Sequence, residues 1–174
     1  MLKKCVFFDR DGVVNRSPGP EYVTRVEDFE ILPEFIASLR VVKSRGYLAI
    51  VVSNQRGVAL GRMTRETVDR IHAHLSETLA AEGLALDAIY YCPHDNGECD
   101  CRKPAPGMLL KAATEFGIDL SASWMVGDSL RDVEAGKRAG CRTVLIGNET
   151  GDVMPDYRLS SVAELPGFLA AHLD

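Results

Sequence analysis

Five polar residues whose side chains could carry out phosphoryl transfer lie at the ends of apolar or cysteine-rich runs. Asp9 and Asp11 come directly after one apolar run, Ser53 after a second and Asp128 after a third, and Lys103 closes a cysteine-rich segment. Transfer of a phosphoryl group needs an in-line nucleophile, a proton shuttle, a metal ion, and cations or hydrogen-bond donors for the phosphoryl oxygens. These residue types can supply every one of those parts.

The spacing of these residues suggests a role for each. Asp9 is the candidate nucleophile, because a carboxylate can attack phosphorus and the resulting aspartyl phosphate can be hydrolysed. Asp11 lies two positions later, on the same side of an extended chain, so it can protonate a leaving alkoxide and then activate water. Asp128 is a hard oxygen ligand suited to Mg²⁺. Lys103 would neutralise phosphoryl charge, and the Ser53 hydroxyl would donate a hydrogen bond to the same group.

Each of these residues also has a structural interpretation. An Asp after a strand is most often a turn residue or a helix cap, and a single Lys-Pro pair carries little information. Four such signals in order, each expected at a strand end of one sheet, favour the catalytic interpretation. We therefore predict a Mg²⁺-dependent phosphatase that forms an aspartyl-phosphate intermediate.

A second group of residues has the pattern of a metal site. Three thiols and one imidazole lie within ten residues: Cys92, His94, Cys99 and Cys101. Soft sulfur and nitrogen ligands at four close positions suit tetrahedral Zn²⁺. The alternative is a loop of reduced, uncommitted cysteines, but free cysteines favour buried apolar positions and this segment is polar. We expect a closed, structural zinc site that fixes the loop presenting Arg102 and Lys103.

The elements that must position these residues alternate along the chain. Strands are expected at 4–8, 47–52, 88–91, 124–126 and 143–146, and helices at 34–45, 65–82, 107–116 and 130–139. This alternation indicates βαβ units and a Rossmann-like α/β fold, with helices on both faces of a parallel sheet. Ligands bind such sheets at the carboxyl ends of the strands, where the polar residues lie. Beyond 148 we expect an irregular tail and a short helix at 162–172, and we expect His72 and His74 on a solvated helix face.

Length and charge narrow the functional class. The 174 residues fit a single domain, with its core at about 4–147. A net charge of −5 argues against a nucleic-acid partner. Charged residues interrupt the N-terminal apolar run too early for a signal peptide, and no run approaches the roughly 20 apolar residues of a membrane span. We expect a cytoplasmic protein without a membrane partner, and nothing in the sequence demands more than a monomer.

Four segments together carry a resemblance to a known superfamily. FFDRDGVV, VVSNQ, CRKP and VGDSLRD match the motifs of the haloacid-dehalogenase (HAD) superfamily of phosphatases, so the chain resembles that superfamily over residues 4–147. The resemblance implies Asp9 as nucleophile and Asp11 as acid/base. It also implies that Mg²⁺ is held by Asp9, the backbone carbonyl of Asp11 and Asp128.

The same resemblance implies further roles. Ser53 and Lys103 would contact the phosphoryl group. Asp132 matches a second acidic position of the fourth motif, where it would orient Lys103 or cap the helix. The sequence contains no cap-sized insertion, so we expect no large cap domain and an active site open to solvent. The connection 15–29 is long enough to form only a small flap.

Members of the superfamily that lack a cap and carry a similar zinc loop fall into two groups. One removes the C7 phosphate of D-glycero-D-manno-heptose 1,7-bisphosphate, a phosphorylated sugar used for bacterial surface glycans, and the other hydrolyses histidinol phosphate. Segments 21–23, 53–64 and 101–108 resemble the heptose group. In that group four residues would lie near the sugar or its second phosphate: Asn54, Gln55, Arg56 and Arg102.

Alternatives to the heptose substrate stay open at this point. Four residues separate His94 from Cys99, a loop length close to that of the histidinol group. This loop length favours the alternatives, histidinol phosphate or another small phosphate ester, whereas the three segments named above favour the heptose bisphosphate, which we expect. A non-enzyme alternative is a receiver domain, which also combines a phospho-accepting Asp with a Lys. Asp11, a proton shuttle two positions after the nucleophile, favours an enzyme.

Overall fold

Apolar runs of the sequence form the strands of a parallel sheet in the computed structural model, which describes residues 1–174. The strands are β1 Cys5–Phe8, β2 Leu48–Asn54, β3 Ala88–Cys92, β4 Trp124–Gly127, β5 Arg142–Ile146 and β6 Tyr157–Leu159. Their order across the sheet is β3-β2-β1-β4-β5-β6, and every neighbouring pair is parallel. The central strands β1 and β4 are buried along their whole length, as a sheet covered on both faces requires. The predicted fold class is confirmed.

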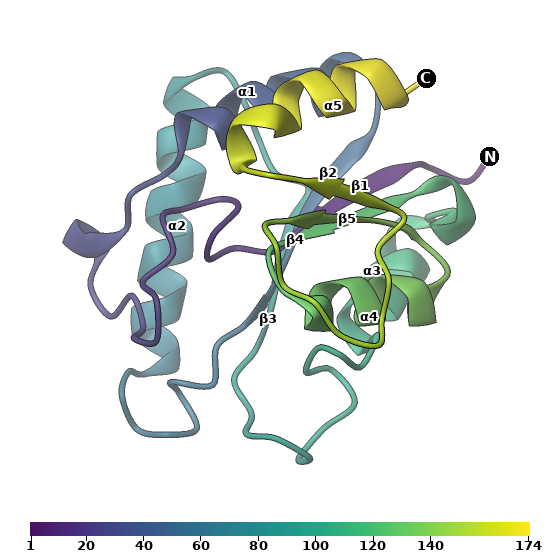
Figure 1. Cartoon of the computed structure of the whole chain (residues 1–174). Coiled ribbons are helices and arrows are strands. Elements are labelled where there is room, and N and C mark those ends of the chain that lie inside the picture. The colour runs from purple at the N-terminus through teal and green to yellow at the C-terminus, as the bar shows by residue number, and fades with distance from the viewer.

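Helices connect the first five strands and cover both faces of the sheet (Figure 1). The α-helices are α1 Pro33–Ser44, α2 Arg65–Ala81, α3 Gly107–Phe116, α4 Leu130–Ala139 and α5 Leu165–His172, and short 3-10 helices span Val26–Asp28 (η1), Leu120–Ala122 (η2) and Val162–Glu164 (η3). Thr64 caps α2 by accepting a hydrogen bond from the Thr67 amide, and Gly117 ends α3 in the left-handed conformation. None of these helices combines the length and apolar character needed to cross a bilayer.

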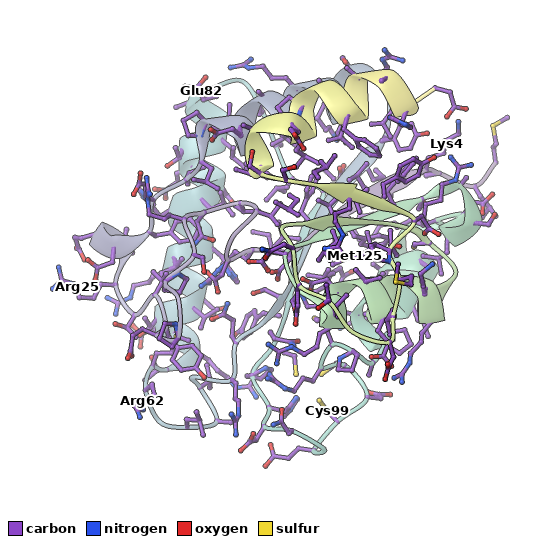
Figure 2. All side chains as sticks on the ribbon, viewed as in Figure 1. Lys4, Arg25, Arg62, Glu82, Cys99 and Met125 are labelled. Carbon is purple, nitrogen blue, oxygen red and sulfur yellow. The ribbon has the colours of Figure 1, made fainter.

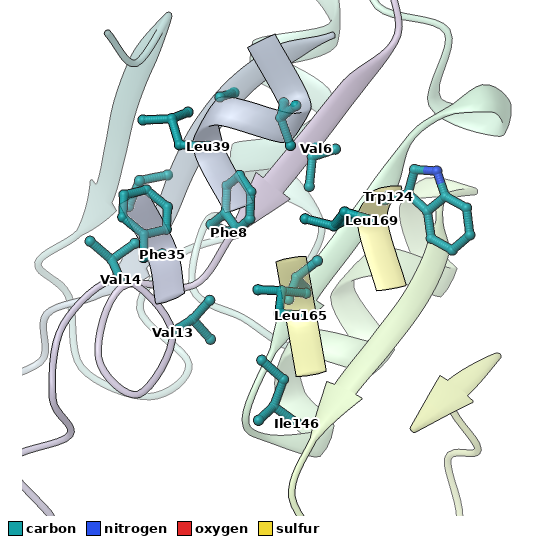
Figure 3. Close-up of a cluster of buried hydrophobic side chains, with 14 of the residues drawn as sticks. Val6, Phe8, Val13, Val14, Phe35, Leu39, Trp124, Ile146, Leu165 and Leu169 are labelled. Atoms are coloured by element: carbon teal, nitrogen blue, oxygen red, sulfur yellow. The ribbon is translucent and has the colours of Figure 1, made fainter. Parts of the chain in front are cut away.

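Alternating side chains of β1 divide the buried residues into two clusters, one on each face of the sheet. Val6 and Phe8 belong to a cluster that also contains buried residues of α1, α2 and α5, and part of it is shown in Figure 3. Cys5 and Phe7 belong to a second cluster, with buried residues of α3 and α4. This division follows from the two-residue period of a strand, which sends successive side chains to opposite faces.

The part of the chain beyond 148 is more regular than predicted. Residues 157–159 form β6, an edge strand that pairs in parallel with β5, so the expectation of irregular structure is wrong there. This strand is short and mostly exposed, and it therefore lacks the apolar pattern that marks the other strands. Asp156 fixes its start, because its carboxylate accepts hydrogen bonds of 2.8 Å from both the amide and the hydroxyl of Thr143. The helix expected at 162–172 is present as η3 followed by α5.

Candidate active site

The carboxyl ends of the central strands bring three carboxylates together. Asp9 follows β1, and its amide donates a 2.9 Å hydrogen bond to the Val126 carbonyl of β4. Asp128 follows β4, and Asp132 lies in the first turn of α4, where it forms a capping box with Ser129. Oxygen atoms of the three carboxylates lie within 4.8 Å of one another. A compact cluster of hard oxygen donors of this kind can hold a divalent cation such as Mg²⁺.

Lys103 supplies the positive charge that faces this cluster. Its side chain is 2% exposed, and its Nζ donates a 2.7 Å hydrogen bond to Asp9 Oδ1 and lies 2.6 Å from Asp132 Oδ1. Burial alone would lower the pKa of Lys103, but the charges of Asp132 and Asp9 outweigh it and raise the pKa above its usual value. Lys103 is therefore a permanent cation that spans Asp9 and Asp132.

Negative charge nevertheless exceeds positive charge at this point, because three carboxylates face one ammonium group. Burial, followed by the charge of Asp132, raises the pKa of Asp9 well above its usual value, and Lys103 opposes this only in part. The same two causes raise the pKa of Asp128 to about 6. A bound divalent cation would offset the surplus charge, so the charge balance of the cluster fits a metal site.

Asp11 is held apart from this cluster, on the wall of the same cavity. Its Oδ1 accepts hydrogen bonds of 3.1 Å from Arg10 Nη2 and 2.9 Å from Asn15 Nδ2, and its Oδ2 accepts one of 3.3 Å from Gln55. The side chain is 26% exposed. These contacts fix a carboxylate in the same cavity as Asp9 but outside the acidic cluster, a placement that would suit a proton shuttle.

Gly12 allows the backbone to turn between these acidic residues. Its φ is +92°, a conformation that side-chain-bearing residues rarely adopt. A Cβ atom at this position would lie 2.0 Å from Asp128 Oδ2. Glycine is therefore required both by the backbone conformation and by the close approach of the Asp128 carboxylate.

The segment after β2 supports the site from behind. Asn54 fixes the Lys103 backbone, because its side chain donates to the Lys103 carbonyl and accepts from the Lys103 amide, both at 3.0 Å. Gln55 is fully buried, and its amide donates a 2.7 Å hydrogen bond to Ser53 Oγ. Ser53 and Gln55 therefore lie beneath the wall of the cavity, whereas Asn54 lines it.

A polar cavity of about 450 Å³ opens over the acidic cluster. Arg56 and Arg102, two of the predicted substrate residues, line it together with Asp9, Asp11 and Lys103. Residues 17–22 of the flap segment form another wall. The cavity is open and is not covered by a cap, as the sequence predicts.

Arg131 also lines the cavity, although sequence reasoning missed it. Its position between Asp128 and Asp132 in the first turn of α4 was the available signal. Arg102 Nη1 is buried without a hydrogen-bond partner. Burial lowers the pKa of Arg102, and the nearby charge of Arg131 lowers it further. Arginines that repel one another across a cavity, without an acidic partner for Arg102 or Arg131, are suited to binding an anionic group.

The predicted zinc ligands lie together at the last residue of β3 and in the loop that follows it, where Figure 2 labels Cys99. The sulfur atoms of Cys92, Cys99 and Cys101 are 3.2–3.4 Å apart, and His94 Nδ1 lies 3.4 Å from Cys101 Sγ. All four ligand atoms lie within 4.8 Å of one another. Four soft donors converging on one point fit a tetrahedral ion.

His72 differs from its prediction. It is 7% exposed, and its imidazole lies against the side chain of Arg10 rather than in solvent. The prediction is wrong because position 72 lies four residues after Val68 and three before Leu75, on the buried face of α2, where Arg10 and Tyr91 contact the ring.

Several known proteins similar to this chain are phosphatases of one family. A HAD-hydrolase-like family model matches residues 100–171. A D-glycero-beta-D-manno-heptose-1,7-bisphosphate 7-phosphatase from Pasteurella multocida (strain Pm70) is 41% identical over 178 aligned positions, which cover 95% of this chain and 96% of the relative. The protein of the same name from Yersinia pestis is 36% identical over 181 positions, which cover 96% of this chain and 95% of the relative.

A solved structure shows a closely similar fold. The D,D-heptose 1,7-bisphosphate phosphatase from B. bronchiseptica, crystallised in complex with magnesium and phosphate, superimposes with a TM-score of 0.85. Its sequence is 30% identical, and the match covers 97% of this chain and 98% of that protein.

Proposed function

This chain belongs to the haloacid-dehalogenase-like family of D-glycero-beta-D-manno-heptose-1,7-bisphosphate 7-phosphatases, and we propose that it removes the C7 phosphate of this sugar bisphosphate. It is a phosphoric monoester hydrolase, and the superfamily predicted from its four motifs is confirmed. The observation that carries the proposal is the cavity itself, which is lined by Asp9, Asp11 and Lys103 and also by Arg102 and Arg131, two arginines without an acidic partner.

In the proposed reaction Asp9 attacks the phosphorus of the C7 phosphate. The bond between phosphorus and the sugar oxygen breaks, and the leaving oxygen takes a proton from Asp11. The Asp11 carboxylate then removes a proton from water, whose oxygen attacks the aspartyl phosphate and releases inorganic phosphate and free Asp9. Lys103 would stabilise the phosphoryl oxygens during both steps. Ser53 Oγ accepts from Gln55, so its own proton is available, and the hydroxyl would donate it to the same oxygens from beneath the cavity wall.

The acidic cluster is the proposed Mg²⁺ site. Asp9, Asp128 and the backbone carbonyl of Asp11 would hold the ion, which when bound neutralises phosphoryl charge and screens the nucleophile from the substrate. Asp132 would act on Lys103 rather than on the ion, since its Oδ1 lies 2.6 Å from Lys103 Nζ. The placement of Lys103 between Asp9 and Asp132 supports this division of roles.

The cysteine cluster is the proposed Zn²⁺ site, with Cys92, His94, Cys99 and Cys101 as ligands. Four protein donors leave no position for a reacting water, so the role would be structural. The loop also ties to the cavity, because Arg102 Nε donates a 2.8 Å hydrogen bond to Asn96. Zinc would therefore fix the segment from which Arg102 and Lys103 reach the substrate.

The arginines of the cavity are the proposed binding site for the sugar and its second phosphate. Arg56 is paired with Asp95 at 2.5 Å, which leaves Arg102 and Arg131 to meet the anion. Asn54 would contact the sugar, as predicted, whereas buried Gln55 would act by supporting Ser53 and Asp11. A monophosphate would leave these two arginines without an anionic partner.

A panel of phosphate-release assays with Mg²⁺ tests the proposal. It compares both anomers of D-glycero-D-manno-heptose 1,7-bisphosphate, the heptose 7-phosphate, histidinol phosphate and simple sugar phosphates. We expect kcat/KM for one heptose bisphosphate to exceed the others by about a hundredfold, roughly 2.7 kcal/mol of transition-state discrimination. Comparable slow rates on every substrate would refute the heptose assignment while leaving the aspartyl-phosphate chemistry in place.

A further inference from the structure

Arg10 is a buried cation that does not line the active-site cavity. Its side chain is 0% exposed, and its guanidinium faces the Phe29 ring at 5.4 Å. Two of its nitrogens donate to Asp11 Oδ1, Nε at 3.2 Å and Nη2 at 3.1 Å. Arg10 therefore acts on the carboxylate of Asp11 and not on a ligand in the cavity.

The third nitrogen of the same guanidinium meets His72, which comes from α2. The distance from Arg10 Nη1 to His72 Nε2 is 3.2 Å. Arginine can only donate hydrogen bonds, so Nε2 must be the acceptor and the imidazole must be neutral, with its proton on Nδ1. Burial and, after it, the charge of Arg10 lower the pKa of His72 to about 3, which agrees with a neutral ring.

The His72 ring is itself firmly placed. Val68, Ile71 and Leu75 on the same helix are fully buried. The ring of Tyr91 packs edge-on against His72, with their centroids 5.5 Å apart. The imidazole is therefore a fixed acceptor for one nitrogen of the Arg10 guanidinium.

We propose that His72 is a positioning residue for the phosphatase reaction, which holds Arg10 so that Arg10 orients the Asp11 carboxylate toward the leaving oxygen. The proposal rests on the acid/base role of Asp11 in the proposed function. Loss of the His72 acceptor leaves a buried guanidinium N–H without a partner, and such groups move or drag neighbours to find one. Asn15 and Gln55 would still hold Asp11, so its orientation would shift without its release from the wall.

The consequence depends on the leaving group. An alkoxide leaves slowly unless it receives a proton as the bond to phosphorus breaks, whereas p-nitrophenolate leaves without one. The ratio kcat/KM covers substrate binding and formation of the aspartyl phosphate. It therefore includes the step in which Asp11 gives up its proton and excludes the later hydrolysis of the intermediate. A misplaced Asp11 should therefore slow alkyl esters much more than p-nitrophenyl phosphate.

The test measures kcat/KM on two substrates, the heptose bisphosphate (or the best alkyl ester of the panel) and p-nitrophenyl phosphate. We expect His72→Leu to lower the alkyl value at least about tenfold and the aryl value less than about twofold, a partial loss of a general-acid effect. His72→Gln can place an amide oxygen near the Nε2 position and should recover most of the alkyl rate. His74→Leu, two positions along α2, should change neither value.

Further variants separate the possible failures. His72→Phe keeps an aromatic ring against Tyr91 and serves as a second acceptor-free variant if the Leu variant folds poorly, as judged by circular dichroism. Equal losses on both substrates, no loss on either, or failure of His72→Gln to recover the rate would each overturn the proposal. Asp11→Asn should show the same substrate difference in a stronger form. If Asp11→Asn lacks that difference, the acid/base role of Asp11 fails, and with it the proposed mechanism.

Discussion

At the scale of single residues, Asp9 offers the most direct test of the chemistry. Asp9→Asn keeps the shape of the side chain but removes the carboxylate proposed as the nucleophile, so we expect kcat to fall by at least about 10⁴-fold. The variant also removes one of three crowded carboxylates. Because burial and Asp132 already raise the pKa of Asp9, its ionised form is unfavourable and the Tm at neutral pH should not fall. Phosphate release and thermal melting measure the two effects, and near-normal turnover would exclude Asp9 as the nucleophile.

A substitution at Gly12 tests how closely the backbone approaches the proposed metal ligand Asp128. Gly12→Ala places a Cβ 2.0 Å from Asp128 Oδ2 at a φ of +92°, so the carboxylate must move. We expect a stability loss of about 1–3 kcal/mol from backbone strain, together with weaker activation by Mg²⁺. Gly46→Ala is the matched control, because Gly46 has a φ of +73° but no atom within 4 Å of the added Cβ. The control should lose stability alone; equal Mg²⁺ dependence in both variants would contradict the role of Gly12.

At the scale of elements, local sequence patterns predicted the bounds of a helix or strand correctly wherever its own residues determine where it begins and ends. Helices α3 and α4 begin and end where periodicity and the following glycines predict, since Gly117 and Gly140 adopt positive φ there. Strand β6 was missed, because an exposed edge strand depends on pairing with β5 and on the contact of Asp156 with Thr143. Such support comes from distant parts of the chain and leaves no local pattern.

The residues of the site likewise divide into those whose position follows from local sequence and those whose position depends on distant parts of the chain. Asp9 and Asp128 could be predicted to meet, because the carboxyl ends of parallel strands meet at one edge of a sheet. The contact between Arg10 and His72 could not be predicted, since it depends on how α2 packs beside the end of β1. Arg131 lies in a helix turn of ordinary composition. Its proximity to Arg102 arises only in the folded protein, where the loop after β3 and the start of α4 line the same cavity.

The loop after β3 gives a prediction for a whole element. Cys99→Ala removes one of four proposed zinc ligands, so we expect loss of bound zinc, a lower Tm and a several-fold lower kcat/KM as Lys103 loses its support. Elemental analysis, thermal melting and phosphate release measure these changes. Cys141→Ala alters a buried cysteine outside the cluster and should keep its zinc. A zinc-free Cys99→Ala protein with unchanged Tm would rule out a structural metal at this loop.

At the scale of the whole molecule, Asp174 connects the C-terminal segment to the start of the chain. Its carboxylate accepts hydrogen bonds from Lys4 Nζ at 2.9 Å and from Tyr47 Oη at 3.0 Å. The hydrogen bond from Lys4, followed by that from Tyr47, lowers the pKa of Asp174 to about 2. A lowered pKa stabilises the fold above the unfolded value of 3.8, and this contribution disappears as the pH falls through about 2.

Asp174→Asn should therefore lower the Tm slightly at pH 5 to 7, and this difference from the parent protein should vanish near pH 2. Melting curves across this pH range measure it. Asp152→Asn, at an exposed position without an ion pair, is the control for the loss of one surface carboxylate and should leave the Tm at pH 5 to 7 unchanged. A constant difference between Asp174→Asn and the parent at every pH would show that the contact does not depend on charge.

The division of the molecule into a catalytic edge and a separate core gives the last prediction. Leu169 of α5 is fully buried in the same cluster as Trp124 (Figure 3), which lies at the amino end of β4, whereas Asp128 follows the carboxyl end of that strand. Leu169→Ala should therefore cost about 2–5 kcal/mol of stability through the cavity it leaves. It should leave kcat/KM unchanged at temperatures where the protein is folded.

Leu110→Ala is the matched control, because Leu110 is 44% exposed and the same truncation there should change stability by less than about 0.5–1 kcal/mol. Urea unfolding gives the free energies, and phosphate release gives the rates. A parallel fall of kcat/KM and stability in Leu169→Ala would mean that the packing of α5 reaches the strand ends. The catalytic edge would then depend on the far end of the sheet, and the independence inferred from the fold would be wrong.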